Sequence, residues 1–420
     1  MTGVGGASPG PAPTPVEVRG RRPSGWVALG LFAAALVALI GISLAGRSGG
    51  RPGSEAAVAT PTATPTATPV ATSSPTASPS PAPGTPPPRV AVSIGPVPTC
   101  PPGSTPDRPG PVDQARPLGL SALAFDRQAG KLVALTGTDN GVETWTFDAC
   151  TNTWTRMHPN QEPVMGGDFR GRLVYDVDSD VTIASDGSRM WAYDLEANTW
   201  TQKGNGEADA GLLVYDLLSG LVVAVDYLGP GLWSYEVETD AWTPITDRLA
   251  IGRPYAYVDF AYDASVDRLV AYANTEGIGP ETWLLDLRTG TWSGTAAVPP
   301  EFSYGGWRMW PAIAYDEAAE RTMMLGQGHS AAYDAVTDRW ETLYVTPYPD
   351  QPGACGTRPE CRSAHQMVYD PVNERLVVYG GVAPTADGKD WVPTDDVLAF
   401  DTRTREWTVL LEASPAQAAP

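Results

Sequence analysis

The chain has 420 residues and carries 28 lysines and arginines against 48 aspartates and glutamates, a net charge of −20 at neutral pH. Six of these basic and two of these acidic residues precede residue 99, which leaves 22 basic and 46 acidic residues, a net charge of −24, for residues 99–420. Such an acidic balance argues against nucleic-acid binding and against a polybasic membrane-docking surface.

The first predicted element is an uncharged apolar run of 22 residues, 25–46. At about 1.5 Å per residue, a helix of this length covers roughly 33 Å, enough to cross the core of a bilayer. Arginines cluster before the run, so the positive-inside rule favours a short cytoplasmic tail of residues 1–24. We expect an uncleaved single-pass anchor. The alternative is a cleaved signal peptide, for which Ser43 and Ala45 supply small residues.

Low-complexity sequence follows in residues 47–98, which consist mainly of Pro, Thr, Ser and Ala. This segment has too few large apolar side chains to form a core, and its prolines favour extended conformations. We therefore expect a disordered stalk that holds one folded domain, residues 99–412, away from the membrane, with a disordered tail at 413–420. The Ala-, Pro- and Gly-rich composition is typical of a bacterium with a GC-rich genome.

An aromatic or aliphatic residue followed by an acidic residue recurs six times, and a Trp always stands six residues after the acid. This spacing indicates a repeated structural unit. The six copies are FDACTNTW (147–154), YDLEANTW (193–200), YEVETDAW (235–242), LDLRTGTW (285–292), YDAVTDRW (333–340) and FDTRTREW (400–407).

A second phrase lies upstream of each copy, in which an aromatic-Asp pair ends one apolar run and a second apolar run begins after a few polar or small residues. This pattern is typical of a β-hairpin whose turn starts at the Asp. The acids of this phrase are Asp126, Asp176, Asp216, Asp263, Asp316 and Asp370.

The two phrases together predict units of four short strands, repeated every 40–54 residues. Four-stranded units with periods of this size indicate the blades of a propeller. The fold class that we expect is therefore all-β, a six-bladed β-propeller, preceded by one transmembrane helix and a disordered linker rich in Pro and Thr.

The last unit resembles a known family. It reads RSAHQMVYDPVNERLVVYGG followed by DDVLAFDTRTREW, with Gly380 and Gly381 after its second strand. In these features the chain, over roughly residues 112–410, is similar to kelch-repeat proteins, including the propeller part of galactose oxidase-like proteins. The Gly-Gly pair occurs in one unit only, so the resemblance implies a divergent kelch-like propeller and carries the fold further than the function.

The four cysteines all follow the apolar run. An even number of cysteines outside the cytoplasm suggests disulfides. Four cysteines allow three pairings, of which we favour Cys100–Cys150 and Cys355–Cys361.

The repeat gives most tryptophans and acids a structural role. Six tryptophans belong to the repeated phrase, four more lie on third strands where they should pack between blades, and the twelve repeat acids should start turns. Trp26 belongs to the apolar run, and the tryptophans left without any such role are Trp307, Trp310 and Trp391.

Strand direction divides the predicted propeller into two faces. Connections between strands 1 and 2 and between strands 3 and 4 lie on one face, which we call the turn face. The other connections lie on the opposite, long-loop face, and the longest of them are 293–311, 345–365 and 380–396.

Long loops on a rigid scaffold commonly carry function. We expect a ligand-binding patch there made of Tyr304, Trp307, Arg308, Trp310, His329 and Trp391. The alternative is that Trp307 and Trp310 only plug the central channel.

Enzymatic function has little support in the sequence. The chain has three histidines. In kelch-like repeats the position just before a first strand often holds a structural histidine, so the resemblance implies a structural role for His365. We find no nucleophile, zinc or phosphate-loop motif, so we expect no catalytic residues, no metal and no cofactor. Some extracytoplasmic kelch-like proteins act on sugars as mutarotases, which keeps one alternative open, with His329 and Arg308 beside Glu301 or Asp390 as acid–base groups.

We therefore expect a membrane-anchored, extracytoplasmic binding protein whose long-loop face recognises a glycan or an envelope protein, with no nucleic-acid partner. A sugar-acting enzyme using the same face and a cell-envelope scaffold without a small-molecule site are the alternatives.

Overall fold

The computed structural model describes residues 95–117, 121–138, 141–165, 173–226, 231–247, 255–275, 279–295, 297–299, 311–326, 328–345, 358–385 and 390–414. The predicted cytoplasmic tail and membrane anchor lie outside these residues, and so do residues 47–94 of the predicted stalk and 415–420 of the predicted C-terminal tail. Within the described part, no helix is long and apolar enough to span a membrane.

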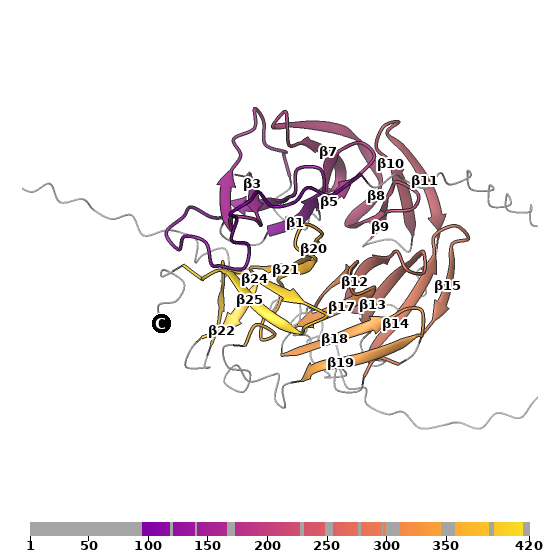
Figure 1. The fold of residues 1–420 in the computed structure, drawn as a ribbon. Coiled ribbons are helices and arrows are strands. Elements are labelled where there is room, and N and C mark those ends of the chain that lie inside the picture. The colour runs from indigo at the N-terminus through magenta and orange to yellow at the C-terminus, as the bar shows by residue number, and fades with distance from the viewer. Residues whose placement is uncertain are drawn as a thin grey trace, which may run out of the picture. The chain divides into compact units, whose positions relative to one another are not determined.

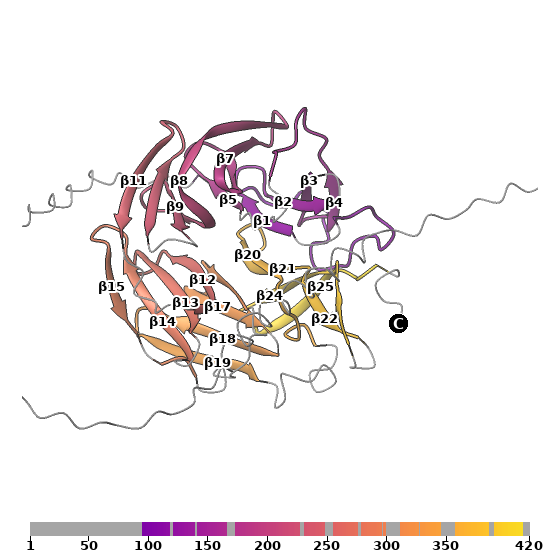
Figure 2. The ribbon, with the colours of Figure 1, turned by 180° about the vertical axis from the view of Figure 1, so that it is seen from behind.

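The described residues form six antiparallel four-stranded blades, as the repeat predicted, and Figures 1 and 2 show them following one another around a ring. In each blade the strands lie side by side in chain order, with the first strand innermost. Blade 1 contains β1 (Ser121–Asp126), β2 (Lys131–Thr138), β3 (Gly141–Asp148) and β4 (Thr153–Arg156); blade 2 contains β5 (Leu173–Asp176), β6 (Val181–Ser185), β7 (Gly187–Asp194) and the first part of β8 (Thr199–Asp216); blade 3 contains the rest of β8, β9 (Leu221–Asp226), β10 (Leu232–Glu236) and β11 (Ala241–Thr246); blade 4 contains β12 (Tyr255–Asp263), β13 (Arg268–Thr275), β14 (Gly279–Asp286) and β15 (Thr291–Gly294); blade 5 contains β16 (Ala312–Asp316), β17 (Arg321–Gly326), β18 (His329–Asp334) and β19 (Arg339–Val345); blade 6 contains β20 (Gln366–Asp370), β21 (Arg375–Tyr379), β24 (Val397–Asp401) and β25 (Glu406–Leu411).

Two features depart from the simple repeat. β8 is 18 residues long and serves both as the outer strand of blade 2 and as the inner strand of blade 3, so these blades form one seven-stranded sheet. Blade 6 contains an additional hairpin, β22 (Val382–Pro384) and β23 (Trp391–Pro393), inserted between β21 and β24.

The hydrophobic core lies between the blades. Each of the six interfaces holds a cluster of buried apolar side chains from two neighbouring blades. The inner strands contact one another in turn around the ring, and β20 contacts β1 to close it. Because side chains of a strand alternate between its two faces, each inner strand packs toward both of its neighbours.

The spacing of six between acid and Trp follows from strand register. In the second turn of blade 1, Asp148 pairs with Thr153 across a four-residue turn, which places Trp154 opposite Phe147. Their rings lie 5.0 Å apart, within the range of favourable aromatic pairs. Each of the other five blades pairs its Trp in the same register, with Leu285 in place of an aromatic residue in blade 4. All six of these tryptophans pack against a cluster between blades.

The repeat acids start the turns, as predicted. Eleven of the twelve accept hydrogen bonds on their carboxylates from backbone N–H groups two or three residues later. The residue four positions after each of the twelve acids has a positive φ. Nine of these residues are Gly, Asn or Asp, which adopt this left-handed conformation most readily.

Residues 95–117, which we call the closure segment, connect blade 1 to blade 6. The Cys100–Cys150 disulfide attaches the segment to the second turn of blade 1, as predicted. Gly110 donates its N–H to the carbonyl of Leu410 in β25. A side chain at Gly110 would collide with the Asn152 carbonyl, because its Cβ would lie 2.0 Å from that oxygen.

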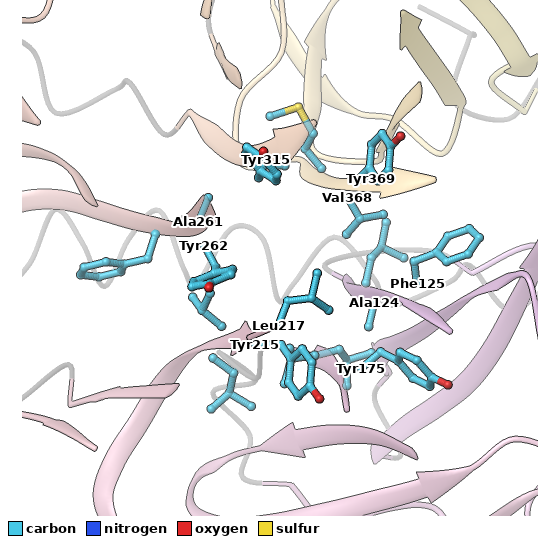
Figure 3. A pocket seen from close by; sticks show the side chains of 18 of the residues that line it. Ala124, Phe125, Tyr175, Tyr215, Leu217, Ala261, Tyr262, Tyr315, Val368 and Tyr369 are labelled. Carbon is cyan, nitrogen blue, oxygen red and sulfur yellow. The ribbon is translucent and has the colours of Figure 1, made fainter. Parts of the chain in front are cut away.

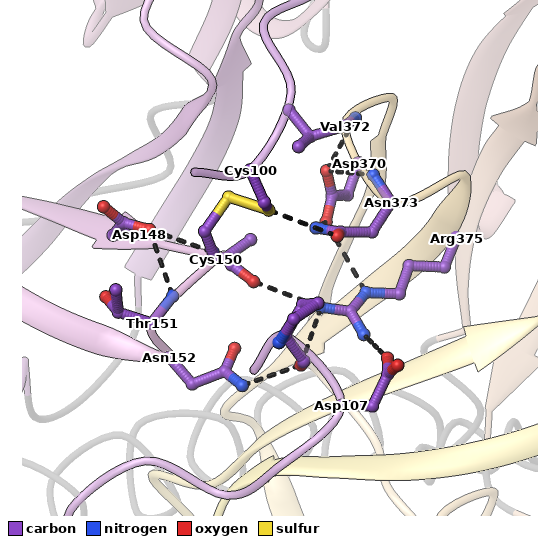
Figure 4. A network of polar contacts seen from close by, with 12 residues as sticks. Cys100, Asp107, Asp148, Cys150, Thr151, Asn152, Asp370, Val372, Asn373 and Arg375 are labelled. Atoms are coloured by element: carbon purple, nitrogen blue, oxygen red, sulfur yellow. Dashed lines mark hydrogen bonds and ion pairs between the residues drawn. A yellow bond between two sulfur atoms is a disulfide. The ribbon is translucent and has the colours of Figure 1, made fainter. Parts of the chain in front are cut away.

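Buried arginines hold the closure segment in place. Arg375, in β21, donates to the Asp107 carboxylate at 3.0 Å and to the carbonyls of Pro106 and Ala149, so one guanidinium contacts blade 1, blade 6 and the segment (Figure 4). Arg116 donates to the Glu412 carbonyl at 2.6 Å. Blades 1 and 6 share no strand, so these hydrogen bonds connect them through the closure segment.

The first prediction concerns this closure. Replacing both cysteines, Cys100→Ser and Cys150→Ser, should lower the free energy of unfolding by about 2–4 kcal/mol, because the disulfide closes a loop of 50 residues in the unfolded chain. Urea denaturation with an unchanged m-value measures this loss. Equal midpoints for the variant and the oxidised wild type would show that the hydrogen bonds of the segment suffice.

Candidate functional site

The two faces of the propeller differ in the way that strand alternation predicts. The turn face carries the twelve turns with a positive φ. On the opposite face, most connections between strands 2 and 3 are short in the structure, and only blade 6 carries the long one with its hairpin. The long second-to-third-strand connection is therefore 380–396, as the sequence indicated.

His329 does not lie in a loop, in contrast to the prediction. It is the first residue of β18 and pairs with Gly326, the last residue of β17. Gly328 has a φ of 83°, which permits so tight a connection. The His329 side chain is fully buried, so solvent does not reach it in this arrangement.

Trp391 stands on the inserted hairpin of blade 6. It begins β23, pairs with Pro384 and is half-buried. The base of the hairpin is attached to the connection from blade 5, because Ser363 and Val382 exchange two backbone hydrogen bonds of 2.9 and 3.0 Å. These hydrogen bonds fix the base of the hairpin, which carries Trp391.

Gly380 and Gly381 permit the close approach between this hairpin and residues 358–365. Both have a positive φ, and a Cβ on Gly381 would lie 2.4 Å from the carbonyl oxygen of Ser363. Gly381 is therefore required by both its backbone conformation and its close contact, and Gly380 is favoured by its positive φ. The same segment is held by Arg362, which forms an ion pair of 2.8 Å with Asp396 and donates to the Gly380 carbonyl.

His365 is a buried, structural residue, in agreement with its predicted role. Its side chain is 3% exposed, and neither ring nitrogen has a hydrogen-bond partner. Burial lowers the pKa of His365 from 6.5 to about 3, and the nearby positive charge of Arg362 acts in the same direction. A ring held neutral and enclosed in this way is poorly suited to acid–base catalysis near neutral pH.

Glu360 links blades 5 and 6 on the long-loop face. Its carboxylate accepts the indole N–H of Trp407 at 3.1 Å, and its carbonyl accepts the N–H of Gly328 at 2.7 Å. Arg358 pairs with this carboxylate at 3.3 Å and stacks over Tyr344 at 3.9 Å from the ring centroid. Arg358 and Tyr344 therefore form a cation–π pair, which the sequence did not indicate. Tyr344 pairs with Ser330, the residue after His329 in β18.

Four residues of the predicted patch, Tyr304, Trp307, Arg308 and Trp310, lie outside the described residues, as does Cys355. Cys361 is disulfide-bonded and fully buried. The structure therefore places His329 and Trp391 in blades 5 and 6, and the patch as a whole stays a prediction.

A central channel of about 260 Å³ passes between the inner strands of all six blades (Figure 3). The aromatic residue before each first-turn Asp lines it: Phe125, Tyr175, Tyr215, Tyr262, Tyr315 and Tyr369. Most other lining residues are aliphatic, so this space suits an apolar or neutral occupant better than a charged one.

An ion pair bridges the channel lining at the turn face. Arg127 of blade 1 contacts Glu317 of blade 5 through two hydrogen bonds of 2.5 and 3.1 Å. This bidentate pair passes over blade 6. Deeper in the lining, the Asp259 carboxylate accepts the backbone N–H groups of Phe260 and Ile313, so it connects blade 4 to blade 5.

Within the described residues, no three carboxylate, imidazole or thiolate groups converge on one point as a preformed metal centre would require. No protein-family model matches this sequence, and no curated protein is significantly similar to it. The fold that the structure shows is a six-bladed β-propeller.

Sequence reasoning missed the hairpin that carries Trp391, although a signal was present. The sequence VAPTADGKDWVP contains Asp-Gly between two short apolar segments, which is a common hairpin signal. The role of Arg116 and Arg375 in ring closure had no local signal, because their partners lie far away in the sequence.

The second prediction concerns His365. As the pH falls from 6.5 toward about 3, the unfolded chain binds a proton that the folded state excludes, so folding loses stability over this range. The variant His365→Gln should lack this loss, which amounts to about 1.4 kcal/mol per pH unit for one group. Urea denaturation at several pH values tests the difference in slope. Parallel curves for variant and wild type would contradict the buried neutral ring.

The third prediction concerns Asp126, whose pKa burial raises to about 6 against the lowering effect of its hydrogen bond with the Ala129 N–H. The folded state keeps a proton that the unfolded state has lost, so stability falls as the pH rises from about 4 to about 6. Asp126→Asn keeps the acceptor oxygen and removes the charge. It should stabilise the protein by on the order of 1–3 kcal/mol above pH 6 and leave stability near pH 4 unchanged.

Thermal and urea unfolding at both pH values measure this effect, and Asp148→Asn, in the partly exposed second turn of the same blade, is the matched control. A gain of equal size at both pH values would show that the carboxylate of Asp126 is not the titrating group.

Proposed function

We propose that the chain is a membrane-anchored, extracytoplasmic, kelch-like propeller that binds a glycan or protein partner through its long-loop face, without catalysis. The observation that carries this proposal is the asymmetry of the two faces. Twelve turns of one kind cover the turn face, whereas the face opposite bears the hairpin with Trp391, attached to the segment that carries Arg358. Irregular, aromatic-bearing additions to an otherwise regular scaffold are typical of recognition surfaces.

The anchored, extracytoplasmic location rests on the sequence of residues 25–46 and 47–98, which read as a membrane span and a stalk. The Cys100–Cys150 disulfide supports it, because structural disulfides persist mainly in oxidising compartments. The kelch-like relationship rests on the blade 6 phrase with Gly380 and Gly381, whose close approach to Ser363 accounts for the Gly-Gly pair.

A glycan is the ligand class that we would test first. Flat aromatic side chains beside polar groups stack on the C–H faces of sugars, and Trp391 would supply such a surface together with the predicted Tyr304, Trp307 and Trp310. The burial of His329 and His365 weighs against the sugar-acting alternative, since an acid–base residue must reach its substrate.

The fourth prediction tests the proposal with purified full-length protein on a glycan array. The wild type should bind a subset of glycans, and the variant Trp307→Ala, Trp310→Ala, Trp391→Ala should lose at least about tenfold in affinity, because each stacked aromatic ring contributes roughly 1 kcal/mol. Val336→Ala is the matched control, since it truncates an exposed apolar residue on the turn face.

Circular dichroism must show that the triple variant is folded. Equal binding by wild type and triple variant would place recognition elsewhere, and no binding by either would favour a protein partner or a scaffold.

A further inference from the structure

Arg358 lies in the segment that joins blade 5 to blade 6 on the long-loop face. It begins a turn in which the N–H of Cys361 donates to the Arg358 carbonyl at 3.0 Å. Two contacts hold its side chain: the guanidinium lies 3.9 Å from the centroid of the Tyr344 ring, and Nη2 donates to the Glu360 carboxylate at 3.3 Å. The Arg358 side chain is nevertheless 52% exposed. These contacts fix the plane of a guanidinium that solvent reaches, so a ligand would lose little side-chain entropy in binding it.

Most of the hydrogen-bonding capacity of this guanidinium is unused. An arginine has five N–H groups, which form two forks that share Nη2. Because the bond to Glu360 uses one N–H of Nη2, one complete fork stays open. In the part of the chain that the structure describes, neither Nε nor Nη1 of Arg358 has a hydrogen-bond partner.

Arg362, four residues later in the same segment, shows the contrast. Its side chain is 4% exposed, and it donates to both carboxylate oxygens of Asp396 at 3.2 and 2.8 Å. It also donates to the carbonyls of Gly380 and Pro359. The fold therefore uses Arg362 on all sides, whereas Arg358 keeps an open fork at the surface.

The position of Arg358 relates it to the hairpin of the candidate site. Ser363 of the same segment is hydrogen-bonded to Val382 at the base of that hairpin. Arg358 and Ser363 are five residues apart in the sequence, so their Cα atoms are separated by at most about 18 Å. An oligosaccharide of a few sugar residues is long enough to reach from Arg358 to the hairpin that carries Trp391.

We propose that the ligand of the long-loop face is an acidic glycan and that Arg358 binds its carboxylate; this inference rests on the proposed function. The planar fork of an arginine matches a carboxylate with two parallel N–H···O bonds, which are stronger than bonds between neutral groups. A carboxylate suits this site better than a phosphate monoester, because the phosphate carries close to two negative charges and Arg358 already shares its single charge with Glu360.

The acidity of the domain does not exclude such a ligand. Residues 99–420 contain 22 basic and 46 acidic residues, a net charge of −24. At physiological ionic strength, however, interactions between exposed charges are screened over about 8 Å. The groups next to Arg358 therefore affect a bound carboxylate more than the distant acids of the turn face do.

The fifth prediction is measured with purified full-length protein on an array that carries each acidic oligosaccharide beside its methyl ester, which has the same sugar and no charge. The wild type should bind the acids at least about tenfold more tightly than the esters, because hydrogen bonds between charged groups contribute more than those between neutral groups. Arg358→Gln should bind acids and esters about equally. Arg358→Lys, which keeps the charge but loses the fork, should keep only part of the preference.

Arg405→Gln is the matched control. Arg405 is similarly exposed, with 55% of its side chain in solvent, and it pairs with Glu341 across the same two blades at the second turn of blade 6. This variant should prefer the acids as strongly as the wild type does. Urea denaturation checks that Arg358→Gln is folded, and Arg358→Lys gives a second measurement of the same contact.

Three results would contradict the inference, and they differ in what else they overturn. Equal binding of acids and esters by the wild type would overturn the acidic ligand and leave the proposed function in place. An unchanged preference in Arg358→Gln would show that another group binds the carboxylate, which overturns the role of Arg358. Absence of binding to every glycan would overturn this inference together with the glycan ligand of the proposed function.

Discussion

The ring has to close between blades that share no strand. Every blade consists of consecutive residues, so the contact of β20 with β1 has to form without a chain connection between them. The structure meets this constraint with the closure segment, whose contacts reach both blades. Arg375 is the centre of this arrangement, because its guanidinium binds the segment, the second turn of blade 1 and Asp370 of its own blade. The Arg127–Glu317 pair adds a second connection that passes over blade 6.

The turns give the repeat acids a structural task. Eleven carboxylates are bound to backbone N–H groups of their own turns. In five turns a Tyr hydroxyl also binds the Asp or Asn at the position with positive φ, which holds the strained residue in place. Function is therefore best sought where a blade departs from the other blades, as blade 6 does at its inserted hairpin.

Much of the fold could be predicted because it is local and repeated. The Phe147–Trp154 pair depends on a turn of fixed length, so its spacing recurs in the sequence wherever the turn does. Three features occur only once in the described residues: ring closure, the continuous strand β8 and the hairpin β22–β23. Because they are not repeated, the periodicity of the sequence could not reveal them. The Cys100–Cys150 disulfide was also predictable, because this pairing attaches the start of the domain to its first repeat.

The candidate site was less predictable than the fold. The position of Trp391 on a projecting hairpin follows from contacts between Ser363 and Val382, which lie in different connections. The burial of His329 depends on a tight turn at Gly328, whose conformation residue type alone does not specify. Side-chain exposure depends on how neighbouring blades pack, so it cannot be derived from the sequence of one repeat.

The disulfide has a mechanical consequence. Hydrogen bonds arranged in series along the closure segment would break one after another if the chain before residue 100 were pulled, as a zipper opens from its end. Cys100 lies ahead of Asp107, Gly110 and Arg116, and it is joined covalently to blade 1 at Cys150. Tension arriving from the N-terminal side therefore passes into the body of blade 1, and the bonds that close the ring stay outside the path of the load.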